Sequence, residues 1–159
     1  MKTRPVRRIV CVDGPDGKSK AIEDGPAPDV RTDPARPGFS STLIWATDST
    51  PARIDCASER VRIPKLLSPP PGGSLCRIVT LPPDRAFRDR ARSPQPTMQK
   101  RRTLDFCLVL EGEITLLLDT GEVHLKAGDT VVQRGANHAW SNRSGRPCTV
   151  AISSHDATY

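Results

Sequence analysis

The sequence has few aromatic residues and no long apolar segment, and these two shortages exclude several classes of protein. Aromatic side chains make up only 4% of the 159 residues. No run approaches the roughly 20 apolar residues that a membrane-spanning helix needs. The charged N-terminus, residues 1–14, also lacks the apolar core of a signal peptide. We therefore expect a cytoplasmic protein with no membrane partner.

A cysteine framework is also missing. The five cysteines are odd in number and widely spaced, with no Cys-x-x-Cys pair. This pattern argues against paired disulfides and against a structural zinc site. Cys11, Cys107 and Cys148 each stand within an apolar run, where a buried and unreactive thiol is the usual state. Reduced thiols agree with an intracellular protein.

Positive charge is in excess, with a formal net charge of +6. Arginines cluster in residues 4–8 and again in residues 85–102. Such an excess suggests nucleic acid or anionic ligands as partners. Neither cluster is interleaved with aromatic residues, as surfaces that stack single-stranded nucleic acid are. We therefore favour a solvated, arginine-rich surface over a nucleic-acid-binding one.

Proline and glycine, by contrast, are plentiful, at 16 and 11 residues. They separate short apolar runs that show no helical period, which favours strands and turns over helices. Short strands joined by tight turns predict an all-β, antiparallel barrel or sandwich. The strands that we expect span residues 7–12, 18–24, 39–47, 74–81, 105–110, 114–119, 122–127, 130–134, 138–142 and 148–154, with a weaker candidate at 60–67.

The length suits a single structural domain. We expect residues 1–97 to supply an N-terminal hairpin, a proline-rich arm and outer strands, residues 98–154 the central part, and residues 155–159 a tail. Four prolines make 25–38 an expected loop or flexible arm, because proline cannot donate to a strand ladder. The arginine-rich stretch 82–97 is expected to be a second loop.

Two motifs carry a resemblance to a known family. The segment G-D-T-V-V-Q-R-G-A-N-H-A-W-S-N, from Gly128 to Asn142, resembles the second motif of the cupins, which are small jelly-roll barrels. D-F-C-L-V-L-E-G, from Asp105 to Gly112, is similar to the end of their first motif. The resemblance implies a single jelly-roll barrel of the small cupins found beside secondary-metabolism enzymes. It also implies a homodimer in which N-terminal strands extend the neighbour's sheet.

The same resemblance implies a metal site, but an incomplete one. Cupins with a full ligand set bind a divalent metal through His-x-His and a carboxylate of the first motif and one histidine of the second. His138 matches the second-motif histidine, and Asp105 stands where the carboxylate belongs. The His-x-His positions fall on Gln99 and Arg101 with a three-residue spacer, or on Met98 and Lys100 with four, and similar cupins tend to have a histidine where Gln99 stands. The candidate ligands for iron, manganese, nickel or zinc are therefore His138, Asp105 and Gln99, and the absence of any metal is the alternative.

Without a metal, His138 and Asp105 remain candidates for a catalytic proton-transfer pair, since histidine titrates near neutral pH. The structural alternative is that His138 only satisfies hydrogen bonds inside the barrel. Trp140 shares the predicted strand face of His138 and would form a flat apolar wall for an aromatic or polyketide-like ligand. Arg101 or Arg102 at the rim could bind a carboxylate or phenolate of such a substrate through its guanidinium. Arg101 and Gln99 are the candidates for substrate contact.

The remaining polar residues of the motifs have structural interpretations. We expect His124 to point outward from its strand and His155 to be exposed in the tail. Gln133 and Arg134 would close a turn, with a surface ion pair that contributes little to stability. Asn142 is expected to tie the turn after its strand.

Together these features predict a cupin-fold small-molecule enzyme acting on an aromatic or polyketide-like metabolite of secondary metabolism. Oxidoreductase, decarboxylase and isomerase or dehydratase chemistry all remain open, and fold alone does not choose among them. The alternative is a non-catalytic protein that binds or senses a small ligand, which the incomplete His-x-His motif favours.

Overall fold

The computed structural model describes residues 5–54, 66–86 and 96–159. In these ranges the regular secondary structure is all strand, apart from one turn of 3-10 helix at Asp84–Ala86, and no helix there could cross a membrane. The strands are β1 (Arg7–Asp13), β2 (Ser19–Pro26), β3 (Asp29–Thr32), β4 (Ser40–Thr47), β5 (Ser74–Leu81), β6 (Thr103–Glu111), β7 (Glu113–Leu118), β8 (Gly121–Lys126), β9 (Thr130–Arg134), β10 (His138–Ser141) and β11 (Cys148–Asp156).

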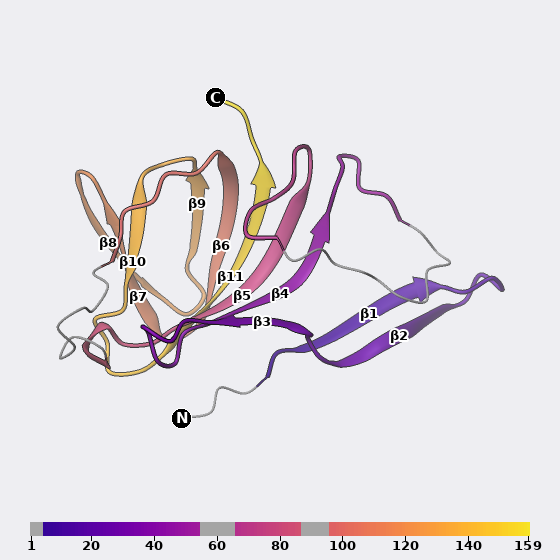
Figure 1. Cartoon of the computed structure of the whole chain (residues 1–159), viewed down its shortest axis with the longest axis horizontal. Helices are drawn as coiled ribbons and strands as arrows, with labels where there is room; N and C mark the ends of the chain where they lie inside the picture. Colours follow the sequence, from indigo (N-terminus) through magenta and orange to yellow (C-terminus); the bar gives the residue numbers. More distant parts are fainter. Residues whose placement is uncertain (1–4, 55–65, 87–95) are drawn as a thin grey trace.

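Two sheets face each other to form the barrel (Figure 1). The larger has the order β3-β4-β5-β11-β6-β9, and the smaller has the order β10-β7-β8. Strands β1 and β2 pair only with each other, and this hairpin projects away from the barrel. The prediction of an all-β antiparallel barrel with an N-terminal hairpin is confirmed.

Strand β6 shows which side of the large sheet is the inside. Its burial alternates residue by residue, because successive side chains of a strand point to opposite faces. Thr103, Asp105, Cys107 and Val109 are buried, while the apolar residues between them are largely exposed. Directly opposite residues of neighbouring strands share a face. The inward side chains of the neighbouring strands therefore follow from those of β6 through the register.

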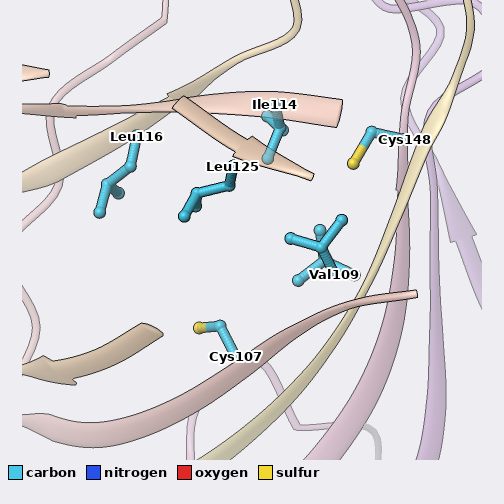
Figure 2. Packing of buried hydrophobic residues seen from close by; sticks show 7 residues of the cluster. Cys107, Val109, Ile114, Leu116, Leu125 and Cys148 are labelled. Carbon is cyan, nitrogen blue, oxygen red and sulfur yellow. The ribbon is translucent and has the colours of Figure 1, made fainter. Parts of the chain in front are cut away.

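The apolar core lies between the two sheets (Figure 2). Inward side chains from β6 and β11 meet inward side chains from β7 and β8, and Trp140 and Ile152 pack against them. Ile114, which is 1% exposed, is the most enclosed of the β7 contributors. A buried aliphatic side chain of this kind typically contributes about 2–5 kcal/mol of stability relative to alanine. The core members are Cys107, Val109, Ile114, Leu116, Leu125, Cys148 and Val150.

The turn from β6 to β7 requires a glycine. Gly112 has a φ of 80°, a region that residues with a Cβ rarely adopt. A Cβ at this position would also lie 2.7 Å from the Pro147 carbonyl oxygen. The glycine that ends the first motif therefore lets the chain cross from the large sheet to the small one.

The proline-rich arm is more regular than the sequence predicts. Asp29–Thr32 forms strand β3, which pairs with β4, so the expectation that all of 25–38 is loop or flexible arm is wrong. The four prolines flank this short strand and do not interrupt it, which leaves its ladder donors intact. At the other end of the chain, β11 continues two residues further than the expected strand, to Asp156.

Cys11 is exposed, which corrects the expectation that it is buried. In β1 the alternation places Arg8 and Val10 on the covered face, so Cys11 points to solvent. The strand suggested for 60–67 lies almost wholly outside the described residues, as does most of the loop 82–97.

The thiols should differ sharply in reactivity. Burial, and then the charge of Asp105, raise the pKa of Cys107 to about 12, while burial followed by Glu111 and Glu113 raises that of Cys148 to about 11. Below its raised pKa each thiol stays protonated; at pH 8 a pKa near 12 leaves about one thiolate in ten thousand. We expect iodoacetamide to label Cys11 in the native protein and to reach Cys107 and Cys148 only after unfolding, as peptide mass mapping would show. Rapid native labelling of Cys107 would contradict the core assigned here.

Candidate active site

Gln99 and His138 are brought together at one end of the barrel. Each donates its backbone N–H to the carbonyl oxygen of the other, at 2.7 and 3.0 Å. Such a directly opposed antiparallel pair carries its two side chains on the same face. Trp140 lies two residues further along β10 and packs on the core, so this face is the interior. The rings of His138 and Trp140 meet edge to face, with centroids 6.1 Å apart, which confirms that they share a face.

A backbone hydrogen bond fixes the tautomer of His138. Its Nδ1 lies 2.9 Å from the Ala136 carbonyl oxygen. A carbonyl oxygen only accepts, so Nδ1 carries the proton and donates it. In the neutral ring Nε2 then holds the free lone pair. His138 is therefore prepared to accept a proton, or to bind a ligand, through Nε2.

Asp105 lies deeper, on the inner face of β6. It is 8% exposed and stands opposite Gln133 of β9 and Ser154 of β11. Thr103 Oγ1 donates to Asp105 Oδ2 at 3.0 Å. Within the described residues, Asp105 Oδ1 is buried and has no hydrogen-bond partner. A buried carboxylate oxygen without a donor is energetically costly, so Oδ1 is a natural place for a donor from a bound ligand.

The first-motif positions hold an amide and a guanidinium joined to each other. Arg101 donates through Nε and Nη2 to Gln99 Oε1, at 3.3 and 2.9 Å. The carbonyl oxygen that would bind a metal is thus already occupied by a cationic donor. Both side chains are exposed at the mouth, and Gln99, which Arg101 holds, pairs with His138 through the backbone.

This donor set does not fit a tightly held metal ion. The described part of the chain contains no group of three histidine, cysteine or carboxylate side chains arranged to bind one. Two strong candidates, Asp105 and His138, fall short of the usual three protein ligands. The third candidate, Gln99, is a neutral oxygen ligand held by Arg101, whose positive charge opposes a nearby cation.

The other histidines lie outside the barrel. His124 projects outward from β8, as predicted, with Nε2 3.3 Å from Glu113 Oε2. His155 belongs to β11 and not to a tail, and it is half-buried because its ring meets Phe106 edge to face at 5.4 Å. Neither ring is available to the interior site.

The turn residues predicted from the sequence are Gln133, Arg134 and Asn142. The prediction of a surface ion pair at Arg134 is wrong, because no acidic partner contacts it within 5–54, 66–86 and 96–159. Gln133 is a buried interior residue. Asn142 is structural, as predicted. Its Nδ2 donates to the carbonyl oxygens of Leu81 and Arg146, both at 2.9 Å, and its Oδ1 accepts from the Ser144 N–H at 3.0 Å.

Sequence reasoning missed two buried charged residues. Asp84 accepts from Ser141 Oγ at 2.6 Å and from the Asn142 N–H at 3.2 Å, which fixes the end of β10. Arg77, in the middle of β5, is 8% exposed and faces the interior. The signal for Arg77 was an arginine at an inward position of the apolar run S-L-C-R-I-V-T-L.

Comparison with known proteins agrees with this fold and motif arrangement. Residues 91–154 match the model of the cupin domain. The chain is 40% identical over 108 residues to phomopsin biosynthesis cluster protein D of Diaporthe leptostromiformis, covering 64% of this chain and 52% of that protein. It is 32% identical over 109 residues to the cupin-domain-containing oxidoreductase virC of Hypocrea virens, covering 66% and 51%. The chain thus spans about half the length of these curated relatives.

Solved structures show the same fold at low identity. The cupin domain of Schizosaccharomyces pombe Cnp3 aligns over 94% of this chain and 87% of its own length, with a TM-score of 0.54 and 8% identity. An HTH_3 family transcriptional regulator from Vibrio cholerae aligns over 80% of this chain and 56% of its own length, with a TM-score of 0.51 and 10% identity. Residues 91–154 thus match the cupin domain, and the solved structures share the fold of the chain.

Restoring the missing histidines should create a metal site that the parent lacks. In the double variant Gln99→His, Arg101→His, two imidazoles replace the engaged amide and the guanidinium beside His138 and Asp105. We expect about one equivalent of zinc or nickel per chain in the variant and clearly less in the parent, measured by elemental analysis after purification without chelator or nickel resin.

Adding His138→Ala to the double variant is the matched control and should remove the acquired metal. A full equivalent of metal in the parent, lost on His138→Ala alone, would show that the native donors do form a working site.

Proposed function

We propose that the chain is a small-molecule cupin enzyme of secondary metabolism that moves a proton with His138 and needs no metal to do so. The observation that carries the proposal is the hydrogen bond from His138 Nδ1 to the Ala136 carbonyl, which leaves Nε2 as the base. The names of the relatives, a phomopsin biosynthesis cluster protein and a cupin-domain-containing oxidoreductase, support a role in small-molecule biosynthesis.

The neighbouring residues supply the rest of a proton-transfer site. His138 Nε2 removes a proton from a carbon next to a carbonyl group, and the C–H electron pair moves onto the carbonyl oxygen. Arg101 donates a hydrogen bond to that oxygen as its negative charge develops. The imidazolium then returns the proton to another carbon, or to a leaving hydroxyl group, which gives an isomerisation or a dehydration.

Binding roles follow from position. Trp140 forms the apolar wall beside His138 and suits an aromatic or polyketide-like body. Asp105 accepts a hydrogen bond from a ligand hydroxyl at its unpartnered Oδ1. Gln99 holds the guanidinium of Arg101 in place and leaves its own N–H groups for the ligand. The same arrangement also suits decarboxylation, because the imidazolium can protonate the carbanion left by departing carbon dioxide.

A second candidate function is non-catalytic binding of the same class of ligand. One observation favours it: in the described residues, no carboxylate contacts the ring of His138, so nothing stabilises the imidazolium by direct pairing. The barrel would then hold the ligand without turning it over.

Deuterium exchange distinguishes the two candidates. Phenylpyruvate combines an aromatic ring, a carboxylate and an acidic C–H next to a carbonyl group, so it is a suitable probe. We expect the protein to accelerate exchange of that C–H in D₂O, followed by proton NMR, and His138→Ala to lower the protein-catalysed rate about 10²–10⁴-fold. His124→Ala, which removes an exposed histidine, is the control and should exchange at the parent rate.

Equal exchange rates for the parent and His138→Ala would sink the catalytic role. Phenylpyruvate bound by the parent without accelerated exchange would favour the binding function instead.

We also propose that the chain forms a homodimer through the outer face of the large sheet and the projecting hairpin. Apolar side chains remain exposed on that face, with Phe106 47%, Leu110 47% and Val132 58% accessible. Ile9 of the hairpin is 51% accessible as well. Apolar groups gathered on one face of a sheet commonly mark a protein interface.

A charged substitution on this face should therefore separate the subunits. Light scattering during gel filtration should give twice the chain mass of 17.3 kDa for the parent and the chain mass for Phe106→Glu. Val123→Glu, at an equally exposed apolar residue on the small sheet, is the control and should remain dimeric. A parent of single-chain mass would exclude the proposed dimer.

A further inference from the structure

The inner face of the large sheet carries a buried arginine beside the apolar core. Arg77 of β5 stands directly opposite Leu43 of β4 on one side and Ile152 of β11 on the other. Leu43 is 1% exposed, and Ile152 packs on the core cluster. Because opposed residues share a face, Arg77 points into the barrel. It is 8% exposed, so its guanidinium is largely removed from bulk water.

Two charged residues of β3 lie on the same inner face as Arg77. Asp29 stands opposite Leu43, and Arg31 stands opposite Ser41, which places both on the inner face. Arg77 Nη1 donates to Ser41 Oγ at 3.4 Å, so Arg77 and Arg31 converge on the same serine position. Arg77 also donates to the Leu66 carbonyl oxygen, which fixes the direction of its side chain.

The charge of Arg101, a residue of the candidate active site, acts on Arg77. Burial lowers the pKa of Arg77, and repulsion from Arg31 and from Arg101 lowers it further, while attraction to Asp29 raises it. Arg31, Asp29 and Arg101 are therefore close enough to Arg77 for their charges to act on it.

The negative charge of the cluster does not balance its positive charge. Among the described residues, the charges that act on Arg77 are those of the guanidiniums of Arg31 and Arg101 and of one carboxylate, that of Asp29. The ion pair between Arg31 Nε and Asp29 Oδ1 is long, at 3.9 Å, and Asp29 Oδ2 is buried with no described partner. Cations kept out of water are stable only when they are paired and hydrogen-bonded. The inward-facing Arg77 and Arg31 therefore favour binding of an anion from outside the chain.

From these contacts we propose that Arg77 and Arg31 form a binding site for the anionic group of a small organic molecule, a carboxylate or a phosphate monoester. A planar guanidinium matches either group with two parallel hydrogen bonds. The body of the ligand then extends across the barrel to Trp140 and His138. That orientation rests on the proposed function, whereas anion binding at Arg77 and Arg31 does not require any turnover.

Isothermal titration with three matched probes tests the site. Benzoate and phenyl phosphate carry the two anionic groups, and benzamide is the neutral analogue of benzoate. We expect saturable binding of at least one anion and none of benzamide under the same conditions. Arg31→Gln and Arg77→Gln should each weaken that binding about tenfold to a hundredfold, the loss of one or two charge-assisted hydrogen bonds.

Control variants separate this site from general charge and from catalysis. Arg143→Gln removes one positive charge at an exposed pair with Glu122 and should leave the binding constant unchanged. Deuterium exchange of phenylpyruvate is measured for the same variants, so loss of turnover and loss of the anion site are distinguishable. Asp29→Asn should tighten binding several-fold, because it removes the one carboxylate that competes with the ligand.

If Arg77→Gln does not fold, Arg31→Gln and the charge-preserving Arg77→Lys decide the matter by the same titration. The proposal is overturned if neither anion binds the parent, or if both arginine variants bind as the parent does. Binding that Asp29→Asn weakens would also overturn it, because the cluster would then be a structural ion network and not a ligand site.

Discussion

The register between β6 and β11 is the constraint on which the rest of the structure depends. It sets Ile152 opposite Cys107 and Ser154 opposite Asp105, and Ile152 in turn places Arg77 on the inner face. A shift of one residue would turn every side chain of β6 to the other face. Such a shift would bring Phe106 into the barrel and expel Asp105, so core and candidate site exist in one register only.

The interior that this register builds combines an apolar core with buried charges of both signs, Asp105 on β6 and Arg77 on β5. At the mouth of the barrel, Gln99 accepts hydrogen bonds from the exposed guanidinium of Arg101. In a space of low dielectric constant, fixed guanidiniums stabilise negative charge on a ligand more strongly than they would in water. The Gln99 that Arg101 holds pairs through its backbone with His138, whose Nε2 is free.

The sequence predicts the second half of the fold well, because β6 to β9 are short strands joined by tight turns at glycines such as Gly112, whose φ of 80° few other residues adopt. It also places His138 and Trp140 on one face, since strand alternation is a local property. It does not predict β3, which pairs with β4, because the prolines on both sides of this short strand indicate a loop. Nor does it reveal that Arg77 and Arg31 share a wall, because that depends on register across three strands.

The anion site at Arg77 and Arg31 is tested most directly by a crystal structure of the protein soaked with an aromatic carboxylate such as benzoate. We expect the carboxylate oxygens of benzoate to lie about 3 Å from the guanidinium nitrogens of Arg77 or Arg31. The benzoate ring should point toward Trp140, and no metal should be bound to His138. A metal ion bound jointly by His138, Asp105 and Gln99, with the carboxylate as its further ligand, would contradict it.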